Sequence, residues 1–396
     1  MTDRAPLKPA SPLTTEPSPP PNRLLGIVAN IVVLLALLYV FLYAIALFGA
    51  AFKLVGKEFS QQLIATTSHP VVGLMIGLLA TSLIQSSSSS TSIVVGMVAG
   101  GALTVQGAIP IIMGANMGTT VTNTLVAMGS MGRRAEFRRA FAGATMHDFF
   151  NLLTICVLFP VEQATHFLER TAHWLSEHLV GTGSVEFQSP VNQAVKPAAK
   201  AFAHWLETGL DLHDVVAGVG MLVVSLVALF FALTMLTRLM RRVVVSRARG
   251  AFAGNLASNG LLGMALGTAV TVLVQSSSIT TSLLVPLIGA GLIPMEGALA
   301  VTLGANIGTT VTALLASLAG NPAAVTVALV HLLFNVTGIL IFYPYPPLRR
   351  VPVRLARLLA LRTSRNRWVA LYYMLGVFFL LPLVFVMISR VLSPAS

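Results

Sequence analysis

The sequence Thr81-Ser-Leu-Ile-Gln85-Ser-Ser-Ser-Ser-Ser90-Thr91-Ser92 returns 190 residues later as Thr271-Val-Leu-Val-Gln275-Ser-Ser-Ser-Ile-Thr280-Thr281-Ser282. A second motif follows each copy, first as Gly114-Ala-Asn116-Met-Gly118-Thr119-Thr120-Val-Thr122 and then as Gly304-Ala-Asn306-Ile-Gly308-Thr309-Thr310-Val-Thr312. The interval from Gln to Asn is 31 residues in both copies. Two motifs and the interval between them do not recur by chance, so the chain contains an internal duplication.

The composition indicates an all-α integral membrane protein. Of the 396 residues, 55% are hydrophobic and 10% are charged, and the mean hydropathy is +0.83. The net charge of +12 does not indicate nucleic-acid binding, because the Lys and Arg residues form short clusters between apolar runs. Such clusters are typical of cytoplasmic loops. The duplicated motifs are therefore polar groups at membrane depth, where they are costly and usually functional.

The first repeat is expected over residues 23–160, after a disordered cytoplasmic tail at 1–22 that contains seven prolines and is not a signal peptide. Residues 24–52 are long and apolar enough for a membrane-spanning helix. Residues 71–84 and 91–105 are too short to span, and they predict a re-entrant hairpin over about 71–105. The run 108–128 predicts a spanning helix unwound near 114–122, and 141–160 returns to the outside.

Residues 161–214 predict an extracytoplasmic loop, since they carry seven acidic residues against three basic ones. The second repeat is expected over 215–346. It comprises a spanning helix (215–236), a re-entrant hairpin (about 261–291), a broken spanning helix (297–318) and a further spanning helix (323–343). A basic cytoplasmic segment (347–367) and a final transmembrane helix (368–396) complete the chain. With every Arg cluster on one face, the repeats enter from opposite sides, which predicts inverted-topology repeats.

Residues 86–92 and 276–282 would begin the second helix of each hairpin. A helix N-terminus offers unpaired N–H groups and a partial positive charge, so two such ends with serine hydroxyls suit a tetrahedral oxyanion. Among the acids only Asp148 and Glu296 lie near apolar depth, which disfavours a cationic substrate and does not repel an anion. Sodium remains possible, because hydroxyl and amide oxygens can bind it.

Other residues have less specific interpretations. Small polar residues in membrane helices often serve packing, although paired motifs at one spacing disfavour that here. His147 and Asn151 echo His331 and Asn335, and hydrogen bonding is the favoured interpretation of both pairs. Five histidines in 161–214 raise the possibility of a metal site, but no cysteine or close His-x₃-His pair supports it. Cys156 is interpreted as a small buried hydrophobe.

The two motifs resemble those of the type II sodium-dependent phosphate cotransporters, over residues 24 to about 345. Two further segments are also similar to that family. They are Ala108-Ile-Pro-Ile-Ile-Met-Gly-Ala-Asn116 and Arg138-Arg-Ala-Phe-Ala-Gly-Ala-Thr-Met-His-Asp148. The resemblance implies phosphate binding by Gln85, Ser86, Ser87, Ser88, Gln275, Ser276, Ser277 and Ser278. Residues with side-chain oxygens of the type that binds sodium are Gln85, Ser90, Thr91, Asn116, Thr119, Thr120, Gln275, Thr280, Thr281, Asn306, Thr309 and Thr310. Gln85 and Gln275 belong to both sets.

The chain departs from animal members of that family in two ways. Their outer loops are disulfide-linked and glycosylated, whereas residues 161–214 hold neither cysteines nor sequons, which favours a bacterial inner-membrane protein. Electrogenic members carry an Asp in the segment that contains Gly101 here. The difference predicts an electroneutral cycle of two sodium ions with one divalent phosphate.

The expected function is sodium-coupled import of inorganic phosphate by alternating access, with no covalent chemistry and no cofactor besides the coupling sodium ions. An alternative is a carrier of another oxyanion such as sulfate or a dicarboxylate, although no arginine lies near either hairpin tip to clamp a carboxylate. An intramembrane serine hydrolase is a remote alternative, because only His147 and His331 are embedded candidates for its base. A scaffold without transport is disfavoured by the paired motifs.

Overall fold

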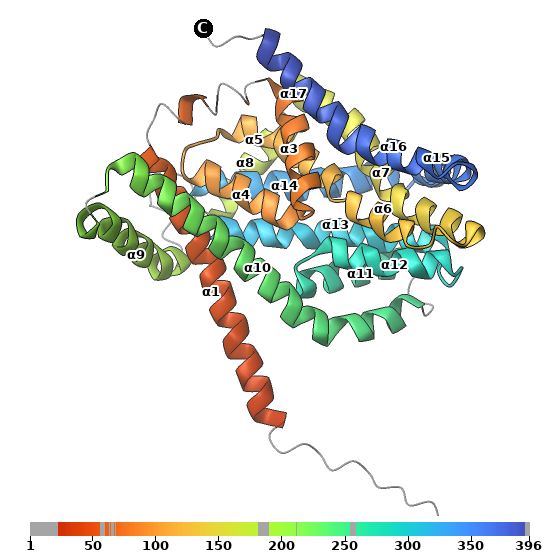
Figure 1. Cartoon of the computed structure of the whole chain (residues 1–396), viewed down its shortest axis with the longest axis horizontal. Coiled ribbons are helices and arrows are strands. Elements are labelled where there is room, and N and C mark those ends of the chain that lie inside the picture. Colours follow the sequence, from red (N-terminus) through yellow and green to blue (C-terminus); the bar gives the residue numbers. More distant parts are fainter. Residues whose placement is uncertain are drawn as a thin grey trace, which may run out of the picture.

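The structure is a computed structural model that describes residues 23–55, 60–62, 64, 67, 69–180, 190–210, 212–253 and 259–392. Within these residues the regular structure is entirely helical, as expected of an all-α membrane protein (Figure 1). The tail predicted at 1–22 lies outside the described residues.

The first repeat begins with a long helix and a pair of short ones. Its helices are α1 (Arg23–Val55), α3 (Pro70–Ile84), α4 (Ser87–Ala99), α5 (Val105–Gly118), α6 (Val121–Met128) and α7 (Arg134–Thr165). Helices α3 and α4 form the predicted hairpin, joined at Gln85 and Ser86. The predicted interruption of the next helix is also present, because α5 and α6 are separate.

The segment between the repeats is mostly helical in its described part. It contains α8 (Phe167–Val180), α9 (Pro190–His204) and the π-helix η1 (Trp205–Gly209), and α10 (Asp214–Ala253) begins the second repeat. Helix α10 continues beyond the spanning helix predicted at 215–236 and includes the arginines between Arg238 and Arg249.

The second repeat repeats the order of the first and is followed by two further helical segments. It begins with α10 and continues with α11 (Gly260–Val274), α12 (Ser277–Gly289), α13 (Met295–Ser317) and α14 (Pro322–Phe342). The basic segment forms α15 (Pro346–Arg365). The last segment comprises α16 (Trp368–Leu375), the π-helix η3 (Gly376–Leu380) and α17 (Leu381–Leu392).

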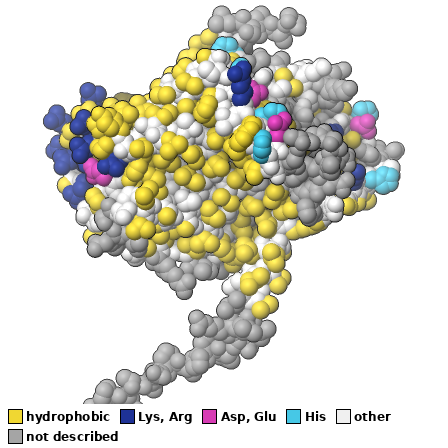
Figure 2. Space-filling model, turned by 180° about the vertical axis from the view of Figure 1, so that it is seen from behind, with side chains coloured by type: hydrophobic (Ala, Val, Ile, Leu, Met, Phe, Trp, Pro, Cys, Tyr) yellow, Lys and Arg dark blue, Asp and Glu magenta, His cyan; other side chains and the backbone are white. Residues whose placement is uncertain are grey.

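Six described helical stretches are long and apolar enough to cross a membrane, and they are 28–55, 134–165, 214–241, 295–317, 322–342 and 368–389. Helices α3, α4, α11 and α12 are apolar but shorter. Figure 2 shows hydrophobic side chains over the middle of the molecule and most of its visible Lys and Arg side chains at one end. An apolar face of this kind fits contact with a bilayer. The re-entry of the hairpins stays a prediction.

The duplication is reproduced in the packing of each hairpin. Helix α3 packs against α5, and α11 packs in the same way against α13. A Cβ atom at Gly114 would overlap the carbonyl oxygen of Leu74, and one at Gly304 would overlap that of Met264. Glycine is required at both positions because two helix backbones approach this closely.

One expectation for the second repeat is wrong: α13 is a continuous helix through Gly304–Thr312, whereas a broken helix was predicted over 297–318. In the first repeat, the Asn151 side-chain amide donates to the Asn116 carbonyl at 2.9 Å, and the Thr120 N–H bonds to Met117 O instead. A side chain inserted into the backbone ladder interrupts a helix. No described side chain donates to the Asn306 carbonyl, so α13 runs on.

Each hairpin also packs on the other repeat. Helix α4, the second arm of the first hairpin, contacts α13, and α12 contacts α6. The tips of both hairpins consequently meet between the repeats.

Candidate functional site

Gln85 and Gln275 form the joints of the two hairpins with the same backbone conformation. Both have φ of 57°, in the left-handed region, and each N–H bonds at 2.7 Å to the carbonyl of the threonine four residues earlier. A left-handed residue ends one helix and redirects the chain, so the next helix can begin two residues later. This conformation is uncommon for residues other than glycine, and its occurrence at both joints follows from the duplication.

The two hairpin tips are in direct contact. The Ser88 hydroxyl donates to the Gln275 carbonyl at 3.3 Å, and the Thr312 hydroxyl donates to Gln275 Oε1 at 2.8 Å. Thr312 Oγ1 also lies 3.4 Å from Ser88 Oγ. The structure thus brings together residues of the two polar motifs that are far apart in sequence.

The N-termini of α4 and α12 differ in how their amides are used. Ser86 Oγ accepts from the Ser89 N–H at 3.2 Å and lies 2.9 Å from Ser89 Oγ, so it caps α4. Ser276, in the equivalent position, makes no side-chain cap to α12. The first N–H groups of α12 are consequently available to an anion.

The threonines and Ser90 of the predicted sodium set share one hydrogen-bonding pattern. All but Thr281 donate the hydroxyl proton to a carbonyl three or four residues earlier in the same helix, over 2.7–3.3 Å (Ser90, Thr91, Thr119, Thr120, Thr280, Thr309 and Thr310). The Thr281 hydroxyl shares its one proton between the Ser277 carbonyl and Asn123 Oδ1, both at 2.9 Å. A hydroxyl that donates inward presents its oxygen lone pairs to the surroundings. These residues are therefore better suited to a cation than to an anion.

The two asparagines of the predicted sodium set lie in a buried network that crosses the repeats. Asn116 Oδ1 accepts from Asn335 Nδ2 at 3.2 Å and lies 3.3 Å from His331 Nε2. Asn306 Nδ2 donates to Asn151 Oδ1 at 3.2 Å. The hydrogen-bonding role favoured for Asn151, His331 and Asn335 is the one that the structure shows. For His147 the same expectation is not met, because neither of its buried ring nitrogens has a partner among the described residues.

The first repeat leaves several buried hydroxyls unsatisfied, whereas their counterparts are paired. Thr122 Oγ1 has no partner among the described residues, while Thr312 bonds to Gln275. Thr81 and Ser92 are also unpartnered there, although the equivalent Thr271 and Ser282 have side-chain partners. Buried polar atoms are rarely left unpaired, so these three hydroxyls are candidates for ligand contacts.

Sequence reasoning missed Asn123. Its Oδ1 accepts from Thr281 at 2.9 Å and from Ser282 at 3.2 Å, which anchors α12 of the second repeat to α6 of the first. The equivalent residue in the second repeat is Ala313, so the duplication gave no signal for this position. Thr122 and Thr312 lay inside the quoted motif and were identifiable from it.

The remaining predicted phosphate ligands surround this contact with varied exposure. Ser87 and Ser277 are buried, Ser86, Gln275, Ser276 and Ser278 are half-buried, and Gln85 is exposed. Gln85 makes no side-chain hydrogen bond to the other hairpin in the described part of the chain. The two glutamines are thus equivalent in backbone and different in side-chain contacts.

Gly101 lies away from the tips. It has φ of 77° and ends the first hairpin, as Gly291 with φ of 78° ends the second. Helix α4 separates Gly101 from the tip by about 20 Å, at a rise of 1.5 Å per residue. The geometry gives Gly101 a role in the turn, and the electroneutral cycle inferred from the absence of an Asp there stays a prediction.

Comparison of the sequence with known proteins agrees with the resemblance described above. A family model described as Na⁺/Pi-cotransporter matches residues 40–185 and 228–358. Sodium-dependent phosphate transport protein 2B of Homo sapiens is 35% identical over 447 residues, which cover 90% of this chain and 64% of that protein. Sodium-dependent phosphate transport protein 2A of Mus musculus is 36% identical over 422 residues, which cover 88% of this chain and 66% of that protein.

The chain thus spans about 65% of the length of the first such relative, sodium-dependent phosphate transport protein 2B of Pongo abelii. No solved structure matches the chain.

Proposed function

Because this chain belongs to the Na⁺/Pi-cotransporter family, we propose that it is a symporter that imports inorganic phosphate with sodium by alternating access. The observation that carries the proposal is the meeting of the two hairpin tips, through Ser88, Gln275 and Thr312. Inverted repeats with a binding site at their interface are typical of secondary transporters.

Phosphate binding is proposed at the tips, between the N-termini of α4 and α12. The uncapped amides of α12 and the hydroxyls of Ser87, Ser277 and Ser278 supply donors for a tetrahedral oxyanion. The amides of Gln85 and Gln275 can donate to the same ligand. No described Arg or Lys contacts these residues, which disfavours a dicarboxylate, because carboxylates pair best with the guanidinium fork.

Sodium binding is proposed at the threonine, serine and asparagine oxygens that surround the tips. Their inward-donating hydroxyls leave lone pairs for a hard cation, which prefers oxygen ligands. An anion bound nearby offsets the cost of burying those cations, so each ligand favours the other. That mutual dependence is the physical basis of coupling, and sodium is the only coupling ion proposed.

We propose a bacterial inner membrane as the location, with the arginine-rich segments in the cytoplasm. The helix α15 and the start of α7 carry arginines, whereas α8 carries histidines and glutamates. The positive-inside rule then puts α8 and α9 outside.

Transport by the purified protein tests the proposal. We expect labelled phosphate to enter proteoliposomes under an inward sodium gradient, and to enter at background rate when potassium or a proton gradient replaces it. Unlabelled arsenate should compete, and succinate should not. Phosphate uptake at the same rate with and without sodium would contradict coupling to sodium. Stronger inhibition by sulfate or succinate than by arsenate would favour a carrier of another oxyanion.

The hydrolase alternative has no support in the geometry. Neither His147 nor His331 bonds to a serine within the described residues, and His331 Nε2 faces Asn116. The family assignment and the names of the relatives favour transport.

A further inference from the structure

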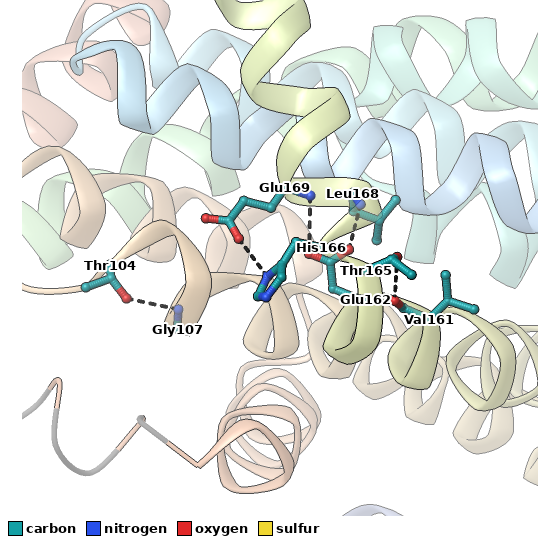
Figure 3. Close-up of polar contacts among 8 residues, drawn as sticks. All are labelled: Thr104, Gly107, Val161, Glu162, Thr165, His166, Leu168 and Glu169. Atoms are coloured by element: carbon teal, nitrogen blue, oxygen red, sulfur yellow. Dashed lines mark hydrogen bonds and ion pairs between the residues drawn. The ribbon is translucent and has the colours of Figure 1, made fainter.

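Three potential metal ligands meet where α7 ends and α8 begins, in a region that the proposed transport site does not use. Glu162 lies in the last turn of α7, His166 is the joint, and Glu169 lies in the first turn of α8 (Figure 3). One ligand atom from each of the three side chains lies within 4.8 Å of those of the other two. His166 Nδ1 and Glu169 Oε2 are 3.0 Å apart.

The joint itself fixes this arrangement. His166 has φ of 53°, so the chain turns there and α8 leaves in a new direction. Glu162 then accepts from two N–H groups of the new helix, from Leu168 at 2.6 Å and from Glu169 at 3.2 Å. Backbone hydrogen bonds that orient a carboxylate are typical of the surroundings of metal ligands.

The cluster holds two carboxylates and one imidazole. Glu169 pairs with His166 at 3.0 Å, and Glu162 is stabilised by the two N–H groups at the start of α8, so no full counter-charge faces Glu162 in the described part of the chain. The Glu162 side chain is 3% exposed, and it forms no ion pair with any Lys, Arg or His among the described residues. A second carboxylate, Glu169, lies beside it. A buried charge is costly unless it is paired or coordinates a metal, and two neighbouring carboxylates repel each other.

We propose that Glu162, His166 and Glu169 bind a divalent transition-metal ion, of which zinc is the best fit. Zinc takes imidazole nitrogen and carboxylate oxygen at about 2.0–2.2 Å, so tetrahedral ligands lie roughly 3.4 Å from one another. The His166 Nδ1–Glu169 Oε2 separation of 3.0 Å and the 4.8 Å limit on the other separations lie on either side of that value. Calcium prefers six to eight oxygens and magnesium a rigid octahedron, so neither suits one imidazole and two carboxylates.

A metal here would hold the joint between α7 and α8, since all three ligands lie within residues 162–169. His166 and Glu169 both line a cavity of about 590 Å³, which also involves Val105 at the start of α5 and Pro322 at the start of α14. Glu162, His166 and Glu169 all line a neighbouring cavity of about 340 Å³. The ion would therefore be reachable from these cavities, and water from them can complete its coordination.

Metal binding by the purified full-length chain tests the proposal, independently of transport. For this experiment the protein is purified with a tag that contains no histidine. It also carries the substitution Cys156→Ser, which removes its only thiol. We expect titration calorimetry with zinc chloride, and elemental analysis after desalting, to find one tight zinc ion per chain. Glu169→Gln should weaken zinc binding at least about tenfold.

His166→Asn is the second test variant, since asparagine tolerates the left-handed conformation and removes the imidazole. We expect the same loss of affinity. His178→Asn, on α8 but outside the cluster, is the matched control and should bind as the parent does. Absence of tight zinc binding by the parent, or unchanged affinity in both test variants, would overturn the proposal. Thermal unfolding without zinc checks that each variant is folded.

Discussion

At the scale of the residue, Gln85 and Gln275 combine a special backbone with a functional side chain. The left-handed conformation costs a residue other than glycine about 1–2 kcal/mol. Glycine would form the same joint without that cost. The presence of glutamine at both joints therefore indicates that the amide is needed for something other than the turn.

Replacement by glycine separates the two roles. We expect Gln85→Gly and Gln275→Gly to keep the hairpins and to lower sodium-driven phosphate uptake at least about tenfold, the effect of losing one hydrogen bond to a charged ligand. Uptake into proteoliposomes, normalised to reconstituted protein, measures this. Gln106→Ala, at an exposed glutamine of α5, should transport normally. Normal uptake by both glycine variants would place the substrate elsewhere.

A second residue-scale prediction concerns Asn123, which accepts hydrogen bonds from Thr281 and Ser282. Asn123→Ala would leave the Ser282 hydroxyl without this acceptor, at a cost of about 1 kcal/mol, whereas Thr281 can still donate to the Ser277 carbonyl. We expect a lower midpoint of thermal unfolding in detergent.

Thr124→Val is the control for Asn123→Ala, because the Thr124 hydroxyl is buried without a partner in the described structure. Its midpoint should be unchanged or higher. Equal midpoints for Asn123→Ala and the parent protein would show that this contact does not anchor α12.

At the scale of the element, each hairpin depends on close contact with the helix that follows it. Gly114→Ala and Gly304→Ala would push α3 from α5 and α11 from α13, since the new Cβ overlaps a backbone oxygen. We expect each to destabilise the protein by about 1–3 kcal/mol, as overpacking does, and to lower its yield in the membrane.

Gly220→Ala is the control at this scale, because nothing lies within 4 Å of a Cβ atom at Gly220 of α10. Alanine in a helix is favoured over glycine, so this variant should unfold at the same temperature or higher. A similar loss of stability in all three variants would argue against specific close packing at Gly114 and Gly304.

The sequence predicted the elements well where the signal was local or repeated. Length and apolar runs located the hairpins, and the interval from Gln to Asn located the residues at their tips. The break between α5 and α6 depends instead on Asn151, which is 35 positions from its acceptor Asn116. No local pattern distinguishes Gly114–Thr122 from Gly304–Thr312, so the unbroken α13 was not predictable. Asn123 was not identified from the duplication, because the equivalent residue in the second repeat is Ala313.

At the scale of the whole molecule, the distribution of charge predicts how the chain sits in the membrane. Single cysteines placed in a Cys156→Ser background report accessibility to an impermeant maleimide. We expect positions 134, 242 and 354 to react only after the membrane is opened, and positions 173 and 200 to react from outside. External labelling at 134 or 242 would rule out the inverted arrangement.

The interruption between α5 and α6 makes the two halves mechanically unequal. In the first half the helix is interrupted at Thr119 and Thr120, beside the Asn116 carbonyl that accepts from the Asn151 amide of α7, whereas α13 is continuous over 23 residues. A rocking motion would bend where the backbone ladder is already open, because that costs fewer hydrogen bonds. We therefore expect the first repeat to move during transport while the second repeat stays fixed, so that the first repeat forms the gate.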